Sequence, residues 1–225
     1  MTALGNATAG AADRSSANAQ CPHVLFRDVL GAATVAALLE HVAAREHEFV
    51  PTGLRNRYSG EEKIDRTMLD RVFLAGLGPF ATRIEALMRA IADEAAAALR
   101  LAERALEPRE FEFAAYRDGG RFGSHIDTDE RLHRVRVLSC VYYFAATPCR
   151  FAGGELRLHG FPHLAGQRGR EPAPHVDIAA ETDTLVVFPS WLRHEVLPVR
   201  VPSRAWADSR FTINCWMHRA DRSVG

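Results

Sequence analysis

Two pairs of residues in this sequence have the types and the spacing of metal ligands. His125 and Asp127 lie two positions apart in YRDGGRFGSHIDTDE, and His175 and Asp177 repeat that spacing in EPAPHVDIAA. Spacing alone carries little information, because ten histidines and 28 acidic residues among 225 give about one such pair by chance. The surrounding sequence must therefore distinguish a metal site from polar residues in a turn.

The surroundings favour the first pair. His125 and Asp127 follow the glycine-rich GGRFG and precede the apolar run RVRVLSCVYYF, which has the composition of a strand. Residues i and i+2 of an extended chain point to one side, so both groups can reach one ion. His175 and Asp177 lie in a proline-flanked connector, for which we expect a solvent-exposed loop.

A third ligand has to come from elsewhere in the fold, and His194 is the natural candidate. It follows TLVVFPSWLR and opens the strand-like run HEVLPVRV. Two histidines and one carboxylate on one face form the facial triad typical of non-haem Fe(II) oxygenases, which leaves coordination positions open. A zinc hydrolase is the alternative for the same three side chains, but no residue stands out as the general base that such an enzyme needs.

The elements that position these residues change in character along the chain. An alternating run at 23–30 predicts a short strand, and residues 31–49 and 79–106 have helical spacing and composition. Residues 51–70 are polar and turn-rich, and we interpret them as a long loop and a candidate lid. From Glu110 onward short β-type runs follow, namely FEFAAY, RVRVLSCVYYF, GELRLHG, TLVVFPS, HEVLPVRV and RFTINCWM. Helices followed by a β sandwich or barrel make an α+β fold.

Composition excludes several classes of function. Lys+Arg and Asp+Glu are equal at 28 each, so we expect neither a nucleic acid nor a membrane surface as the main partner. No apolar run has the length of a membrane span. The four cysteines form no C-x-x-C pair, which fits a reducing cytoplasm. Residues 1–20 lack the pattern of a signal peptide, and their composition predicts a disordered tail.

The ordered set HID, YYF, GGELRLHG, LVVFPS, HEVLPV and RFTINCWM resembles the Fe(II)/2-oxoglutarate-dependent dioxygenases of the prolyl-hydroxylase type. The resemblance covers roughly Phe111 to His218, about half of the chain. It implies an α+β fold whose double-stranded β-helix (jelly-roll) core packs with N-terminal helices. It also implies a single oxygenase domain over residues 21–219, with a helical support region over about 21–108, a core over about 109–219 and a tail at 220–225.

The resemblance implies Fe(II) at His125, Asp127 and His194, with 2-oxoglutarate and dioxygen as cosubstrates. It also implies a basic residue on the last core strand that binds the distal carboxylate of 2-oxoglutarate. Arg210 is our choice, because a guanidinium binds a carboxylate through two parallel hydrogen bonds and because Arg210 begins RFTINCWM. Alternation on this strand puts on one face Arg210, Thr212, Asn214 and Trp216, of which Thr212 and Asn214 are further candidates for cosubstrate binding.

Three further residues enter through the same resemblance. Tyr143 matches a hydroxyl that reaches the distal carboxylate, and Tyr116 matches an aromatic residue that lines the cosubstrate pocket. Arg204 stays the alternative arginine, because the connector RVPSRAWADS is longer than in the shortest family members.

The implied activity is hydroxylation of an unactivated C–H bond in an amino acid or a peptide residue, with release of succinate and carbon dioxide. The carboxylate of Asp127 occupies the position where related halogenases leave room for chloride, which favours hydroxylation. The alternatives are tailoring of a small natural product by hydroxylation, desaturation or cyclisation, and a non-catalytic sensor of iron and 2-oxoglutarate. The partner is then a small molecule or a peptide, and the sequence does not indicate an oligomeric state.

Overall fold

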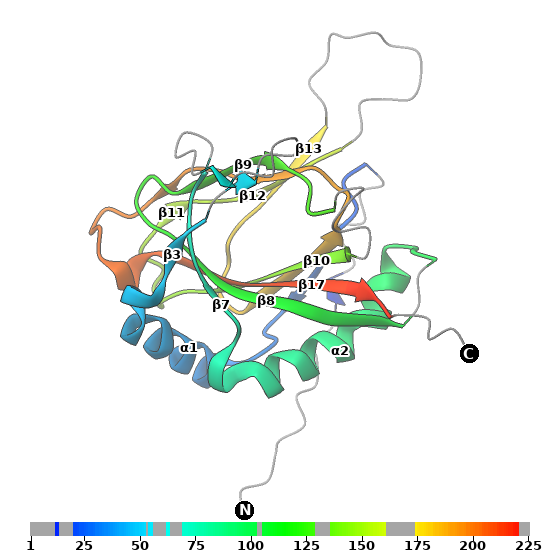
Figure 1. The fold of residues 1–225 in the computed structure, drawn as a ribbon, viewed down its shortest axis with the longest axis horizontal. Helices are drawn as coiled ribbons and strands as arrows, with labels where there is room; N and C mark the ends of the chain where they lie inside the picture. Colours follow the sequence, from blue (N-terminus) through cyan, green and yellow to red (C-terminus); the bar gives the residue numbers. More distant parts are fainter. Residues whose placement is uncertain are drawn as a thin grey trace, which may run out of the picture.

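The computed structural model describes residues 12–13, 20–52, 54–55, 62–63, 69–102, 105–128, 136–160 and 174–220. Two antiparallel sheets face each other, and two helices cover the outer side of the larger sheet (Figure 1). The helices are α1 (Ala32–Ala44) and α2 (Ala81–Ala98), with 3-10 turns at Glu46–Glu48, Gly78–Phe80 and Trp206–Asp208. No helix among these residues is long and apolar enough to cross a lipid bilayer.

The larger sheet has eight strands. Their order is β1 (Ala12–Asp13), β2 (Val24–Arg27), β14 (Thr184–Pro189), β10 (Arg136–Phe144), β17 (Arg210–Arg219), β8 (Leu106–Tyr116), β7 (Val72–Ala75) and β3 (Val50–Pro51). The smaller sheet has the order β13 (His175–Ile178), β12 (Leu156–His159), β15 (His194–Val196), β9 (Arg121–His125) and β6 (Leu69–Asp70). Two-stranded ribbons join β11 (Ala152–Gly153) to β16 (Val199–Arg200) and β4 (Leu54–Arg55) to β5 (Glu62–Lys63).

Both expected helices are present, and the core explains where they lie. On α2 the buried positions recur every three or four residues, at Ile84, Leu87, Met88, Ile91, Ala92, Ala95 and Ala96. These side chains pack in one cluster with the outer face of the larger sheet. The second helix ends at Ala98, earlier than expected, because β8 already begins at Leu106, where it pairs with Arg219 of β17.

Strand β17 alternates as the sequence predicted. The side chains of Phe211, Ile213, Cys215 and Met217 belong to the core beneath the helices. Those of Arg210, Thr212, Asn214 and Trp216 line a cavity between the two sheets. The strand therefore separates the apolar core from a polar interior surface.

Two expectations for the strands were wrong. HEVLPVRV does not form one strand, because Pro198, which has no N–H group, interrupts it; β15 pairs in the smaller sheet and β16 with β11. His175 and Asp177 do not lie in a loop. They belong to β13, which pairs along its whole length with β12, and Ile178 is buried.

Other expectations fall mostly outside the described residues. Within the expected tail 1–20 the structure describes Ala12–Asp13, which pair with β2, and Gln20. Within the candidate lid 51–70 it describes Pro51 and Thr52 at the start, the paired strands β4 and β5, and the strand β6, which pairs with β9. The rest of both segments and residues 221–225 lie outside the described residues, so a disordered tail and a lid stay predictions.

Candidate functional site

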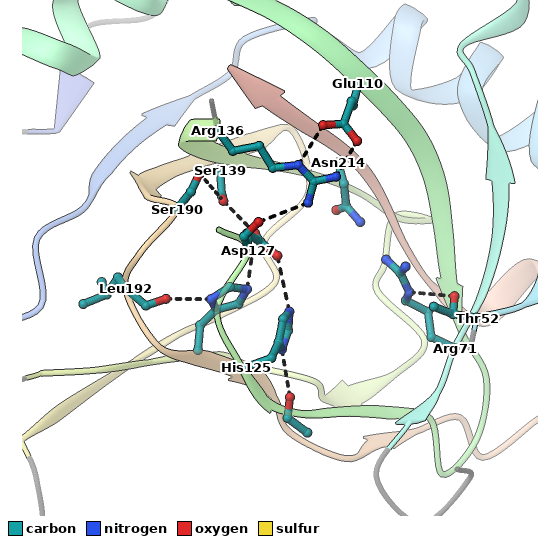
Figure 2. Close-up of polar contacts among 12 residues, drawn as sticks. Thr52, Arg71, Glu110, His125, Asp127, Arg136, Ser139, Ser190, Leu192 and Asn214 are labelled. Carbon is teal, nitrogen blue, oxygen red and sulfur yellow. Dashed lines mark hydrogen bonds and ion pairs between the residues drawn. The ribbon is translucent and has the colours of Figure 1, made fainter. Parts of the chain in front are cut away.

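Pairing of two strands brings the proposed metal ligands together. His125 is the last residue of β9, and His194, the first residue of β15, is its direct partner in the antiparallel register. The two imidazole centroids are 4.2 Å apart. Asp127 follows β9 by two residues, and one ligand atom from each of the three residues lies within 4.8 Å of the others. Figure 2 shows the His125 side chain pointing toward the carboxylate of Asp127.

Backbone carbonyl groups fix the orientation of both imidazole rings. His125 Nδ1 donates to the Gly123 carbonyl at 2.8 Å, and His194 Nδ1 donates to the Leu192 carbonyl at 2.9 Å. In the neutral form of each ring, Nε2 is then the nitrogen without a proton. Each Nε2 lies 3.5 Å from a carboxylate oxygen of Asp127. A hydrogen bond on the far nitrogen is the usual support of a metal-binding histidine.

Asp127 is held by three neighbours. The Ser139 hydroxyl donates to Asp127 Oδ2 at 2.6 Å, and Ser190 Oγ lies 3.0 Å from Ser139 Oγ. The Asp127 amide donates to the Ser190 carbonyl at 3.0 Å, and Arg136 donates to the Asp127 carbonyl at 3.2 Å. These contacts come from β10 and from the turn after β14, so the larger sheet positions the carboxylate.

The ionisation states suit a divalent cation. Burial raises the pKa of the Asp127 carboxyl, but His194, His125 and Ser139 together outweigh burial and hold that pKa well below its usual range. Burial lowers the pKa of His194 to about 4, and the neighbouring His125 acts in the same direction. One carboxylate and neutral imidazole nitrogens are the forms that bind a metal ion.

The three residues border a cavity of about 360 Å³ that both sheets enclose. Its wall also includes Tyr116, Arg210, Thr212 and Asn214, all named as candidates from the sequence. Arg210 is 1% exposed, and its Nε, Nη1 and Nη2 atoms make no hydrogen bond among the described residues. A buried guanidinium without partners is costly unless an anion binds it.

Aromatic rings and two hydroxyl groups surround this guanidinium. Its central carbon lies 4.8 Å from the Tyr116 ring and 5.0 Å from the Tyr143 ring. The Tyr143 hydroxyl and Thr212 Oγ1 are also buried without a hydrogen-bond partner in the described part of the chain. Burial raises the pKa of Tyr143 to about 12. The hydroxyl is therefore protonated at neutral pH and can donate to an anion beside Arg210.

Gly154 leaves the space that the Arg210 side chain occupies. A Cβ atom on Gly154 would lie 2.6 Å from Arg210 Cδ and 2.7 Å from Val199 Cγ2, and the glycine has a φ of +73°. The second glycine of GGELRLHG thus allows the guanidinium to reach the cavity.

Arg204, the alternative arginine, lies elsewhere. Its side chain is 83% exposed, and its Nε is 3.5 Å from Asp118 Oδ2. The connector that carries it is held on the outside of the sheet, because Trp206 packs against Phe49 and donates to the Val42 carbonyl. The structure therefore brings Arg210, and not Arg204, into the cavity.

Sequence reasoning missed two arginines that line the cavity, Arg71 and Arg136. Arg71 pairs with Glu112 at 2.5 Å. Arg136 pairs with Glu110, and its guanidinium carbon lies 4.2 Å from the Trp216 ring. Nothing in the sequence pattern singles them out, because Arg71 ends a polar segment and Arg136 begins a strand among other arginines.

Comparison with known proteins accounts for this arrangement. Residues 111–218 match the family model of the 2OG-Fe(II) oxygenase superfamily. This segment belongs to the 2OG-Fe(II) oxygenase superfamily. The oxygenase segment contains Asp127, both histidines of the triad and the cavity face of β17.

Three of the proteins that this chain resembles are named as hydroxylases. A PKHD-type hydroxylase of Synechocystis sp. is 34% identical over 110 residues, which are 49% of this chain but only 36% of that protein. A Pseudomonas putida prolyl-4-hydroxylase superposes with a TM-score of 0.61 over 92% of this chain and 97% of its own, at 22% identity. A Trichoplax adhaerens prolyl hydroxylase, solved with a peptide fragment of hypoxia inducible factor, has the same TM-score over 92% and 87% of the chains, at 18% identity. The chain thus has the fold of these two prolyl hydroxylases.

The superfamily uses Fe(II), 2-oxoglutarate and dioxygen, and the residues present fit the first two. His125, Asp127 and His194 form a facial set for the metal. Arg210 supplies a buried cation that has no hydrogen-bond partner in the described part of the chain, and the same holds for the nearby hydroxyl groups of Tyr143 and Thr212. The fit rests on the donor set and on these unsatisfied polar atoms.

Proposed function

We propose that this chain is an Fe(II)- and 2-oxoglutarate-dependent dioxygenase that hydroxylates an unactivated C–H bond of an amino acid or a peptide residue, releasing succinate and carbon dioxide. The observation that carries the proposal is the guanidinium of Arg210, which is buried and has no hydrogen-bond partner among the residues that the structure describes. It lies in the same cavity as His125, Asp127 and His194. A ligand with two carboxylates, one near the triad and one at Arg210, would supply the negative charge that the Arg210 guanidinium can bind.

Each residue has a defined role in this proposal. His125, Asp127 and His194 would hold the iron. Arg210 would bind the distal carboxylate of 2-oxoglutarate through parallel hydrogen bonds. The hydroxyl groups of Tyr143 and Thr212 would complete that site, and they are buried without partners among the described residues.

The bound iron and cosubstrate supply the oxidative chemistry, because oxidation of 2-oxoglutarate activates dioxygen for attack on a C–H bond. The chain itself orients the ligands and excludes water. Tyr116 covers one side of the Arg210 guanidinium, and burial raises the pKa of Tyr116. Tyr116 is therefore neutral and does not compete with the carboxylate for the cation.

We further propose that the two facing sheets are the double-stranded β-helix, or jelly roll, of a single oxygenase domain over residues 21–219. The antiparallel order of the strands and the many neighbours that are not consecutive in sequence support this connectivity. The helices on the outer face would be its support region (Figure 1).

The test is formation of succinate that depends on a substrate. Purified protein with Fe(II), 2-oxoglutarate and air is given free amino acids, peptides or a cell extract. We expect succinate in step with a product that is one oxygen atom heavier than its substrate. A product that is lighter by two hydrogens would assign desaturation or cyclisation instead. If 2-oxoglutarate binds in a metal-dependent way but no mixture yields succinate, the result would favour the alternative of a non-catalytic sensor.

A further inference from the structure

A second polar cluster lies in the wall of the same cavity. Arg71 precedes β7, and its Nη1 donates to Glu112 Oε1 at 2.5 Å, while its Nε donates to Thr52 Oγ1 at 3.1 Å. The side chains of Arg71 and Glu112 are only 8% and 12% exposed. Arg71 lines the cavity, and in Figure 2 its terminal nitrogens point toward Asn214. Tyr116 also interacts with this guanidinium. The N–H groups that are not directed at Glu112, Thr52 or Tyr116 can donate to a ligand in the cavity.

Asn214 is bound by the same carboxylate oxygen. Its Nδ2 donates to Glu112 Oε1 at 3.0 Å. An ionised carboxylate only accepts hydrogen bonds, so the amide nitrogen must face Glu112 and Oδ1 must face away from it. Because Asn214 also lines the cavity, this oxygen offers an acceptor there, beside the donors of Arg71.

This cluster is separate from the proposed cosubstrate site but close to the triad. Asn214 is four residues along β17 from Arg210, so the two Cα atoms are about 14 Å apart, too far to share one carboxylate. Arg71 interacts with Tyr116, which also contacts Arg210, and it extends toward His125. Its guanidinium carbon is 5.1 Å from the Phe122 ring, whose centroid is 4.1 Å from the His125 ring. One aromatic ring therefore separates the cluster from a triad residue.

The charge of the cluster selects what it can bind. Glu112 already neutralises Arg71, and a second carboxylate bound there would lie close to that of Glu112 and be repelled. A neutral group that accepts from Arg71 and donates to Asn214 matches the surface better. An amide, with a carbonyl and an N–H group side by side, has this pattern.

We propose that Arg71 and Asn214, both fixed by Glu112, form the subsite that binds an amide group of the substrate and so determine substrate specificity. This inference rests on the proposed function, and it assigns Asn214 to the substrate rather than to 2-oxoglutarate. A purely structural role of the Arg71–Glu112 ion pair makes a different prediction, because a neutral pair of similar size would then preserve ligand discrimination.

The test measures binding of small probes to protein loaded with Mn(II) and 2-oxoglutarate, by ligand-observed NMR. The probes are the N-methylamides of short carboxylic acids, the matched methyl esters, which contain no N–H group, and the matched free acids. The variants are Arg71→Gln/Glu112→Gln, which removes both charges, and Asn214→Ala, which leaves the Arg71–Glu112 pair in place. The control is Arg157→Gln/Asp177→Asn, because that ion pair, at 2.7 Å between β12 and β13, joins two strands by residues that do not line the cavity.

In the wild type we expect a methylamide to bind about tenfold more tightly than its ester, the difference of about one hydrogen bond. Both cavity variants should reduce this ratio to less than about twofold and leave the affinity for 2-oxoglutarate within about twofold. The control should keep the wild-type ratio.

Three results would overturn the subsite. They are esters or free acids that bind as well as the methylamides, a preference that survives in both cavity variants, and no binding of any probe although 2-oxoglutarate binds. If 2-oxoglutarate itself does not bind to the metal-loaded wild type, the proposed function fails instead.

Discussion

His125 and His194 are direct partners on the neighbouring antiparallel strands β9 and β15, with their ring centroids 4.2 Å apart. Both histidines donate Nδ1 to the carbonyl of the residue two positions earlier. Strand pairing thus sets the spacing of the rings, and local backbone sets their orientation. The backbone therefore fixes both the spacing and the orientation of the two imidazole rings.

Removing any residue of the triad should abolish turnover and weaken iron binding. His125→Ala, Asp127→Ala and His194→Ala each remove one side chain of a set whose ligand atoms lie within 4.8 Å. Iron content and substrate-dependent succinate are the measurements. His175→Ala is the control, because this exposed histidine belongs to the other His-x-Asp pair, on β13. Near-wild-type turnover with bound iron in any triad variant would show that the ligands are misassigned.

Gly154→Ala should lower the affinity for 2-oxoglutarate by about tenfold or more. The new Cβ would lie 2.6 Å from Arg210 Cδ, so the guanidinium has to move. Gly119→Ala is the matched control, since Gly119 also has a positive φ, +84°, but its Cβ would meet nothing within 4 Å. Both variants carry the backbone strain of a side chain at positive φ, and only Gly154→Ala should change cosubstrate binding. Equal affinities in the two variants would refute this role of Gly154.

Acid should destabilise the protein partly through His23. Burial lowers the pKa of His23 below its ordinary value of 6.5, although its hydrogen bond to the Cys21 carbonyl, 2.8 Å long, acts in the opposite direction. The unfolded chain therefore binds more protons than the folded one below about pH 6.5, and the free energy of unfolding falls as the pH decreases toward the folded-state pKa.

Urea denaturation at pH 7.5 and pH 5.5 measures this effect. The loss of stability between the two values should be smaller in His23→Gln than in the wild type. Some loss should remain in the variant, because burial also lowers the pKa of His41 and of His194. An unchanged loss in His23→Gln would exclude a contribution from His23.

Local patterns in the sequence predicted the elements that carry the site. Alternation in RFTINCWM correctly placed Arg210 and Asn214 on the cavity face, because side-chain direction in a strand depends on position alone. Arg210 also followed from the expectation that a strand begins there. For His125 and Asp127 the surrounding sequence, and not the spacing alone, favoured this pair over His175 and Asp177, and Asp127 itself lies beyond the end of β9.

The contacts and strands that the sequence did not predict depend on pairing between segments that are far apart along the chain. Arg71 and Glu112 meet only because β7 pairs with β8, and no local pattern reports that register. The strand at His175–Ile178 was missed because its pairing with β12 outweighs the flanking prolines. The break in HEVLPVRV had a visible signal, Pro198, which removes a donor from the ladder.

The central claim is that one cavity holds a metal ion and 2-oxoglutarate, with Arg210 as the anchor. It is tested most directly by titrating 2-oxoglutarate into Fe(II)-loaded protein without oxygen, for the wild type, Arg210→Ala and Arg204→Ala. Arg210→Ala should lose about thirty- to a thousand-fold in affinity, because a buried charge-assisted pair is worth about 2–4 kcal/mol. Arg210→Lys should recover part of the loss, since an ammonium group lacks the planar fork, and Tyr143→Phe should lose less than Arg210→Ala.

Arg204→Ala should bind 2-oxoglutarate almost as the wild type does, because the Arg204 side chain is 83% exposed and its ion pair with Asp118, at 3.5 Å, lies at the surface. A large loss in Arg204→Ala together with a small loss in Arg210→Ala would contradict the account.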